Sequence, residues 1–187
     1  SIIIFVRDRA DKKESMASPA ATVAEQGAPG VDRPWLVSDI MNSQAGFLAS
    51  GATVRDAIDI LRSSETSGVP VVDEQQAVIG FVSDGDILKY LSKQSGFYTD
   101  GTNYFEMVES QDFADRLVDL LDLDVMRIAT QRVICVEADD DPEDAFKTLS
   151  AKRIKKVPVV KDGKLVGSLS RRNIISALSI LEQTQAA

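Results

Sequence analysis

The chain repeats itself, and this repeat constrains the fold more than any other feature of the sequence. Residues 68–73 read Gly-Val-Pro-Val-Val-Asp, and about 88 positions later residues 156–161 read Lys-Val-Pro-Val-Val-Lys. Ordered matches continue on both sides of this block: Asp39 with Asp124, Asp56 with Asp144, Leu61 with Leu149, Gly80 with Gly167, and Ile87 with Ile174. Neither copy is long enough to cover both faces of a small sheet, so the sequence predicts two similar units packed together.

Each copy is predicted to run strand, helix, strand, strand, helix. In the first copy these elements are a short strand at 47–49, a helix capped by Thr53, a buried strand at 69–72, a strand at 78–82, and a helix carrying Ile87, Leu88 and Leu91. In the second copy, Pro142 suits the first turn of a helix, and Asp162 with Gly163 predicts a hairpin turn. The predicted fold is of the α/β (α+β) class: two β-α-β-β-α repeats related by pseudo-twofold symmetry, with a ligand cleft between them.

The repeats also set the predicted domain boundaries. These are an N-terminal segment and linker at 1–36, the first repeat at 37–93, an insert with an amphipathic helix at 94–123, the second repeat at 124–182, and a C-terminal tail at 183–187. The helix in the insert either packs on its own module or binds a partner, and a homodimer interface would satisfy both interpretations.

Charge and residue usage exclude several classes of function. The net charge of −8 disfavours nucleic acid and anionic membranes as partners. The charge is uneven, because from Met126 onward Lys and Arg outnumber Asp and Glu by about three, so an anionic ligand should prefer the second half. The chain has no histidine, which removes the usual general base and the commonest metal ligand. Cys135 stands alone in an apolar run and is interpreted as a buried structural thiol.

No stretch contains the roughly eighteen consecutive apolar residues that a membrane span needs, and we expect a cytoplasmic location. One segment leaves an alternative open. The apolar residues 2–6 run directly into Arg7, which is the order found at the cytoplasmic end of a transmembrane helix. The segment is either an edge strand or disordered leader, or the end of a membrane domain upstream, in which case the chain lies on the cytosolic face of a membrane protein.

The candidate chemistry lies where a strand passes into a helix. Ser83 and Asp86 stand three apart at this point in the first repeat, and Ser170 and Asn173 occupy the same place in the second. This spacing is typical of a capping box, which needs no ligand. It also suits a nucleotide, because the start of a helix attracts a phosphate and a carboxylate can accept hydrogen bonds from both hydroxyls of a ribose.

The doubled pattern resembles a tandem CBS-domain pair, also called a Bateman module. The resemblance rests on the Asp-Ile-Met and Asp-Val-Met openings, the Val-Pro-Val-Val strands, and the turns Gly-Phe-Val-Ser-Asp-Gly-Asp and Gly-Ser-Leu-Ser-Arg-Arg-Asn. It implies that AMP, ADP, ATP or S-adenosylmethionine binds in the clefts between repeats as a regulatory ligand, with no catalytic cofactor. It also implies that the serine contacts phosphate and that the acid holds the ribose.

The resulting set of candidate binding residues comes from both repeats. They are Gly46, Gly68, Val69, Pro70, Ser83, Asp86, Arg132, Ile134, Lys155, Lys156, Val157, Pro158, Ser170, Arg171, Arg172 and Asn173; no catalytic or metal-ligating residue is proposed. The chain departs from the family pattern at Gly85, where an arginine is common, and at Asn173, where an acid is usual. The second site is expected to take a phosphorylated ligand because basic residues gather there, although any one of them is also ordinary solvated surface.

Three functions are compatible with these features. The first is a regulatory module that senses an adenosine nucleotide or S-adenosylmethionine and controls an attached effector or membrane domain. The second is a dimerisation module with vacant pockets, which the two departures favour. The third is an enzyme, which the sequence disfavours because no nucleophile with a base can be assembled from it.

Overall fold

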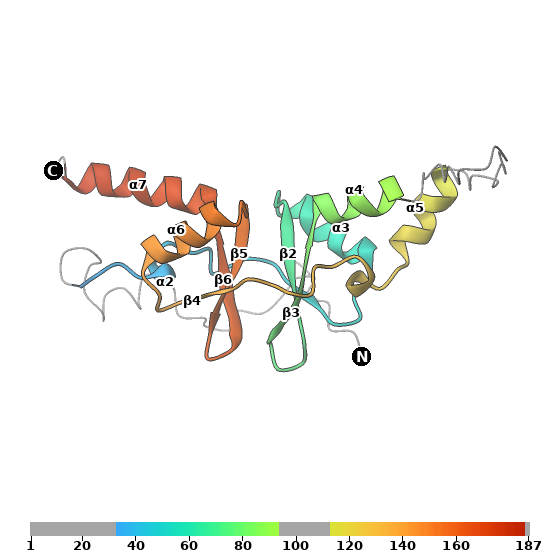
Figure 1. The fold of residues 1–187 in the computed structure, drawn as a ribbon, viewed down its shortest axis with the longest axis horizontal. Helices are drawn as coiled ribbons and strands as arrows, with labels where there is room; N and C mark the ends of the chain where they lie inside the picture. Colours follow the sequence, from blue (N-terminus) through green and yellow to red (C-terminus); the bar gives the residue numbers. More distant parts are fainter. Residues whose placement is uncertain (1–32, 94–112, 186–187) are drawn as a thin grey trace, which may run out of the picture. The chain divides into compact units, whose positions relative to one another are not determined.

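The computed structural model describes residues 33–93 and 113–185, and Figure 1 shows their helices and strands. In chain order the elements are α2 (Val37–Ile40), β1 (Leu48–Ala49), α3 (Val54–Ser63), β2 (Gly68–Val72), β3 (Val78–Ser83), α4 (Asp84–Lys93), α5 (Phe113–Leu121), the 3-10 helix η1 (Val125–Arg127), β4 (Val136–Glu137), α6 (Pro142–Ala151), β5 (Lys156–Lys161), β6 (Lys164–Ser170) and α7 (Arg171–Gln185). The predictions made for residues 1–32, 94–112 and 186–187 lie outside the described residues.

These elements form two compact units, each with its own sheet and core. Of the described residues, unit 1 contains 46–93 and 113–133, and unit 2 combines those up to 45 with those from 134 onward. Each sheet has three strands, in the orders β1-β2-β3 and β4-β5-β6. In both, the first two strands run parallel and the last two antiparallel. The predicted class of mixed helices and strands in two repeats is confirmed.

Burial of aliphatic side chains, helix caps and a tight turn explain why these segments form strands, helices and a hairpin. All five residues of β2 are buried, as its continuous apolar sequence predicts. Helix α3 begins after Thr53, whose hydroxyl caps it, and α6 begins after Asp141 with Pro142 in its first turn. Asp162 and Gly163 both have positive φ in the β5–β6 hairpin, which confirms the turn predicted there.

The compact units do not coincide with the sequence repeats, because each unit takes its covering segment from the other repeat. Helix α2 precedes the first repeat's sheet but packs in unit 2, where the Ser38 N–H donates to the carbonyl of Ala138 over 2.9 Å. Correspondingly, Val125 in η1 is fully buried in unit 1, and its N–H donates to the carbonyl of Ala52 over 2.8 Å. The two covering segments hold equivalent places in the two units.

Strand register assigns each side chain to one of two faces of its sheet. Val69, Val71 and Val82 belong to the unit 1 core, and Val157, Val159 and Leu169 to the unit 2 core. Because neighbouring residues in a strand point to opposite faces, the residues between them lie on the other face. We call this the outer face; it carries Gly68, Pro70, Phe81 and Ser83 in unit 1, and Lys156, Pro158, Ser168 and Ser170 in unit 2.

Helix α5, which the insert contributes, packs within unit 1. Its residue Leu120 is 1% exposed, and the helix contacts α3. Among the described residues, no helix is both long enough and apolar enough to pass through a bilayer.

Candidate functional site

The turn from β3 to α4 in unit 1 is closed by a reciprocal pair of side chains. The carboxylate oxygen Oδ2 of Asp86 accepts hydrogen bonds from the N–H of Ser83 over 2.9 Å and from its hydroxyl over 2.6 Å. The hydroxyl of Ser83 in turn accepts from the N–H of Asp86 over 3.2 Å. Among the described residues, no hydrogen bond uses the second oxygen, Oδ1, which leaves an acceptor for a ligand.

The turn from β6 to α7 in unit 2 has the same geometry with an amide in place of the acid. The Oδ1 atom of Asn173 accepts from the N–H of Ser170 over 2.8 Å and from its hydroxyl over 2.7 Å. Because the N–H of Ser170 can only donate, the oxygen of the amide must face the turn and the Nδ2 group must face away. Unit 2 therefore offers N–H donors where unit 1 offers a carboxylate acceptor.

A third pair shows that this geometry is a helix cap in its own right. At the start of α3, Oδ2 of Asp56 accepts from the N–H of Thr53 over 2.8 Å and from its hydroxyl over 2.9 Å. The interpretation of the Ser83 and Ser170 turns as capping boxes is thus compatible with the geometry, and so is ligand binding through the atoms left over.

The outer faces beside these turns differ more than the turns do. In unit 1, a Cβ atom added to Gly68 would lie 2.4 Å from Cε1 and 2.6 Å from Cζ of Phe81, so the aromatic ring occupies the place of a side chain at position 68. In unit 2, the equivalent strand positions hold Lys156 and Ser168. Where unit 1 has a glycine beside a large aromatic ring, unit 2 has a lysine beside a small serine.

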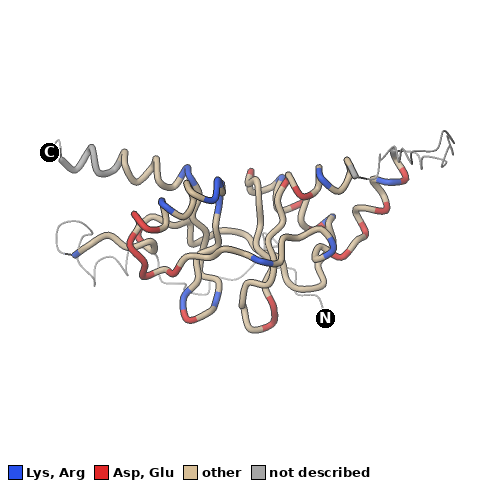
Figure 2. The backbone as a smooth tube through the Cα atoms, in the orientation of Figure 1, with Lys and Arg blue, Asp and Glu red and all other residues tan. Residues whose placement is uncertain are grey.

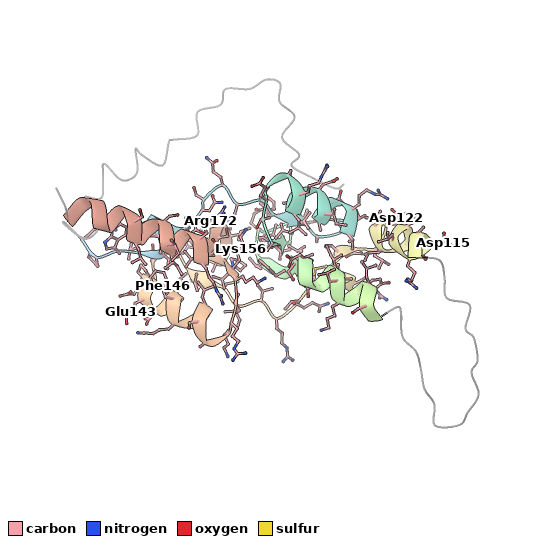
Figure 3. The ribbon with its side chains drawn as sticks, turned by 90° about the horizontal axis from the view of Figure 1, so that it is seen from above. Asp115, Asp122, Glu143, Phe146, Lys156 and Arg172 are labelled. Atoms are coloured by element: carbon pink, nitrogen blue, oxygen red, sulfur yellow. The ribbon has the colours of Figure 1, made fainter. Side chains whose placement is uncertain are left out.

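Positive charge gathers at the unit 2 turn. Lys156 is half-buried, and burial lowers the pKa of its ammonium group below the ordinary range. The Nε–H of Arg171 donates to the carbonyl of Ile154 over 3.3 Å. Arg172 is exposed and makes no hydrogen bond or ion pair with the described residues. Figure 2 shows Lys and Arg, in blue, where α7 begins, and Figure 3 labels Lys156 and Arg172.

The opposite sign prevails at the unit 1 turn. Asp84 and Asp86 both lie in the first turn of α4, and Gly85 stands between them. A phosphate there would meet carboxylates, whereas at the start of α7 it would meet guanidinium groups. The structure thus assigns the two turns opposite electrostatic character within otherwise similar units.

The other predicted site residues divide between the units. Unit 1 holds Gly46, Gly68, Val69, Pro70, Ser83, Asp86 and Arg132, and unit 2 holds Ile134, Lys155, Lys156, Val157, Pro158, Ser170, Arg171, Arg172 and Asn173. The side chains of Val69 and Val157 lie in the two cores, so only their main chains are available to a ligand on the outer face. Ile134 is 37% exposed two residues before β4, and Gly46 is exposed two residues before β1.

Sequence reasoning missed Phe81 and Ser168 as members of the site. Both lie two residues before the serine of their turn, so the alternation of side chains along a strand would have placed them on the same face. The sequence does not show that Phe81 lies near Gly68 and Ser168 near Lys156 on the adjacent strand, because this depends on how the two strands pair.

Comparison with known sequences identifies the repeated unit. The CBS domain profile matches the chain twice, over residues 37–93 and 124–180. The chloroplastic CBS domain-containing protein CBSX2 of Arabidopsis thaliana is 29% identical over 181 residues, which cover 90% of this chain and 74% of that protein. Inosine-5'-monophosphate dehydrogenase of Methanocaldococcus jannaschii is 23% identical over 124 residues, which cover 66% of this chain and 19% of that enzyme.

Comparison with solved structures gives the same fold. A crystal structure of CBSX2 in complex with AMP superposes with a TM-score of 0.61 at 24% identity, covering 80% of this chain and 99% of that one. The CBS domain pair of protein MJ0100, in complex with 5-methylthioadenosine and S-adenosyl-L-methionine, superposes with a TM-score of 0.55 at 22% identity, covering 78% of this chain and 96% of that one.

Proposed function

Because the chain belongs to the CBS domain family, we propose that it is a regulatory module without catalytic activity of its own, which senses an adenosine nucleotide or S-adenosylmethionine. The observation that carries the proposal is the pair of serine turns at the starts of α4 and α7, each with polar atoms left over for a ligand. The adenosine compounds in the related structures give the chemical class of ligand.

The unit 2 turn is the proposed phosphate site. The N–H and hydroxyl of Ser170 already donate to Asn173, so the Nδ2 group of Asn173 supplies the donors at this turn, and Arg172 supplies an exposed guanidinium beside it. Lys156 adds an ammonium group on the same face of the sheet as Ser170. AMP, ADP and ATP all present the required phosphate.

The unit 1 turn is the proposed partner of a sugar. The free Oδ1 of Asp86 is a charged acceptor, and charge-assisted hydrogen bonds to hydroxyls are stronger than neutral ones. A ribose diol supplies two such hydroxyls. Asn173 presents donors instead, and is better suited to an oxygen of the ligand.

Matched variants separate ligand binding from helix capping. Asp86→Asn and Asp56→Asn keep an oxygen for equivalent caps, as Asn173 does in unit 2, so each should change stability by less than about 1 kcal/mol. Only Asp86→Asn should weaken binding of AMP in calorimetric titration, by about tenfold to a hundredfold. Arg172→Ala should weaken binding of AMP but leave adenosine unaffected.

Three outcomes would contradict the proposed function. If AMP, ADP, ATP and S-adenosylmethionine all give neither heat nor a thermal shift with the unaltered chain, nucleotide sensing is excluded. Equal effects of the Asp86 and Asp56 substitutions on binding would show that the turn acts only as a cap. Release of phosphate from ATP would contradict the assignment as a non-enzyme.

A homodimer is the second part of the proposal, and it is also the alternative function if the pockets are vacant. Leu88 on α4 and Ile175 on α7 hold equivalent positions in the two repeats, and they are 66% and 67% exposed. Leu178, in the next turn of α7, is 54% exposed. Apolar side chains exposed at the same place in both repeats suit a symmetric interface with a second copy.

Ultracentrifugation tests the dimer. Leu88→Glu and Ile175→Glu should shift the chain to a monomer, whereas Val118→Glu on α5, at a site 55% exposed, should not. A monomeric unaltered chain would exclude this interface. A stable dimer that ignores every nucleotide would favour the dimerisation module over the sensor.

The setting of the module follows from its proposed role. We place it in the cytoplasm, or on the cytosolic face of a membrane protein, where nucleotide levels report on metabolism. An effector or membrane domain attached to the chain would receive the signal.

A further inference from the structure

Position 81 in unit 1 and position 168 in unit 2 are equivalent, yet they hold side chains of very different size. Phe81 lies on the outer face beside Ser83, and its ring covers the backbone of Gly68. No side chain larger than hydrogen fits at position 68 while the ring keeps this place, because an added Cβ would meet ring carbons at 2.4 and 2.6 Å. Unit 1 therefore has neither a cation at this position nor space for one.

The same region of unit 2 holds a long side chain, that of Lys156, and a buried polar atom without a partner among the described residues. Ser168 is 1% exposed, and its hydroxyl oxygen has no hydrogen-bond partner among the described residues. Ser168 shares the outer face with Lys156 and Ser170. A buried hydroxyl without a partner calls for an explanation such as a bound ligand or water.

We propose that Phe81 and Ser168 are the residues that decide which repeat accepts an anion, so that the module binds phosphate through unit 2 alone. This inference rests on the proposed function and deepens it. In unit 1, the ring of Phe81 occupies the space in which a cation would have to stand to pair with a phosphate. In unit 2, the small Ser168 leaves room for Lys156 and adds a hydroxyl that an anion would satisfy. The consequence is one phosphorylated ligand per chain.

The steric part of the proposal is tested without a ligand, by a double-mutant cycle. Gly68→Lys should lower the midpoint of thermal unfolding by about 5 °C or more, because the new Cβ collides with the ring. Phe81→Ser removes the ring, and the double variant should regain most of that loss. Additive effects of the two substitutions would refute the claim that the ring occupies the space of side chain 68.

The ligand part is tested by equilibrium dialysis with AMP. The unaltered chain should bind one AMP, and the double variant Gly68→Lys, Phe81→Ser should bind a second one. The reverse exchange, Lys156→Gly with Ser168→Phe, should abolish binding of AMP while the chain stays folded by circular dichroism. Two AMP per unaltered chain, or one per double variant at saturation, would overturn the proposal.

Phe81→Ser alone excludes a different role for the ring. If the ring were a stacking platform for adenine, this substitution would weaken AMP binding by about tenfold or more, whereas our proposal predicts a change of less than about twofold at the existing site. If the unaltered chain binds no AMP at all, the proposed function falls and the selection of a repeat falls with it. If it binds AMP but the exchanges leave the stoichiometry unchanged, only the selection by Phe81 and Ser168 falls.

Discussion

The substitution of Gly167 by alanine tests the most specific packing feature of this fold, the passage of a covering segment over β6. A Cβ atom at this position would lie 2.7 Å from the carbonyl oxygen of Asn42 and 3.0 Å from the sulfur of Met41. Ordinary contacts begin near 3.4 Å, so the Asn42 carbonyl would have to retreat by about 0.7 Å. That carbonyl belongs to the backbone and cannot rotate away.

The magnitude follows from what holds Asn42 in place. Its N–H donates to the carbonyl of Ser168 over 2.8 Å, and its carbonyl accepts from the N–H of Ser168 over 3.0 Å. Overpacking costs about 1 to 3 kcal/mol, and stretching two such hydrogen bonds costs up to about 1 kcal/mol each. Alanine recovers about 0.5 to 1 kcal/mol through its smaller backbone entropy in the unfolded chain. We therefore expect Gly167→Ala to destabilise by about 2 to 3 kcal/mol.

The equivalent glycine in unit 1 provides a matched control. A Cβ atom at Gly80 would lie 2.8 Å from the sulfur and 3.1 Å from the methyl carbon of Met126. These atoms end a flexible side chain and can move, so Gly80→Ala should cost less than about 1 kcal/mol. Gly85→Ala meets only the hydroxyl oxygen of Ser83, at 3.5 Å, and should be neutral or stabilising at the start of a helix.

Urea unfolding measures all three free energies. The single tryptophan, Trp35, packs against the unit 2 core, so its fluorescence reports the unit that contains Gly167, while circular dichroism reports both units. If Gly80→Ala proves as costly as Gly167→Ala, the distinction between backbone and side-chain neighbours is wrong. If both are neutral, the covering segment does not lie where the structure places it.

Three further perturbations follow from charge and from topology. Asp39 forms a bidentate ion pair with Arg33 at 2.6 and 2.8 Å, and the two side chains are 7% and 18% exposed. Asp39→Ala should therefore lower the free energy of unfolding by about 2 to 3 kcal/mol. Asp122→Ala, which breaks an exposed pair, should lower it by less than about 0.5 kcal/mol. The hydrogen bond from Arg33 lowers the pKa of Asp39, so this contribution is present at neutral pH and is lost as the pH falls below about 4, which unfolding measured against pH would detect. Burial of the Lys156 ammonium group lowers its pKa and disfavours its charged form in the fold. Lys156→Met should therefore raise the midpoint of thermal unfolding at pH 7 while weakening AMP binding. A lower midpoint would contradict the destabilising effect of the buried charge. A fragment of residues 46–133 should fold by circular dichroism, since it contains every described residue of unit 1, whereas a fragment cut at the first repeat's boundaries should not.

Local sequence patterns were sufficient to predict the elements of both repeats. The apolar run at 69–72, the cap at Thr53 and the Asp162-Gly163 turn each depend on neighbouring residues only, and the structure confirms all three. The serine turns before α4 and α7 were also visible, because a helix cap is a local device. The family resemblance rests on the same doubled pattern.

The tertiary structure alone decided which segments complete each unit and which side chains share a face. Helix α2 covers the sheet of the other repeat, and the contact between Phe81 and Gly68 depends on pairing between strands. Such contacts join residues that the sequence separates, and their register is settled by the burial of a whole sheet rather than by any one residue. For that reason the sequence predicted from charge alone that the second site favours a phosphate, whereas only the packing shows the ring of Phe81 against Gly68 in the first.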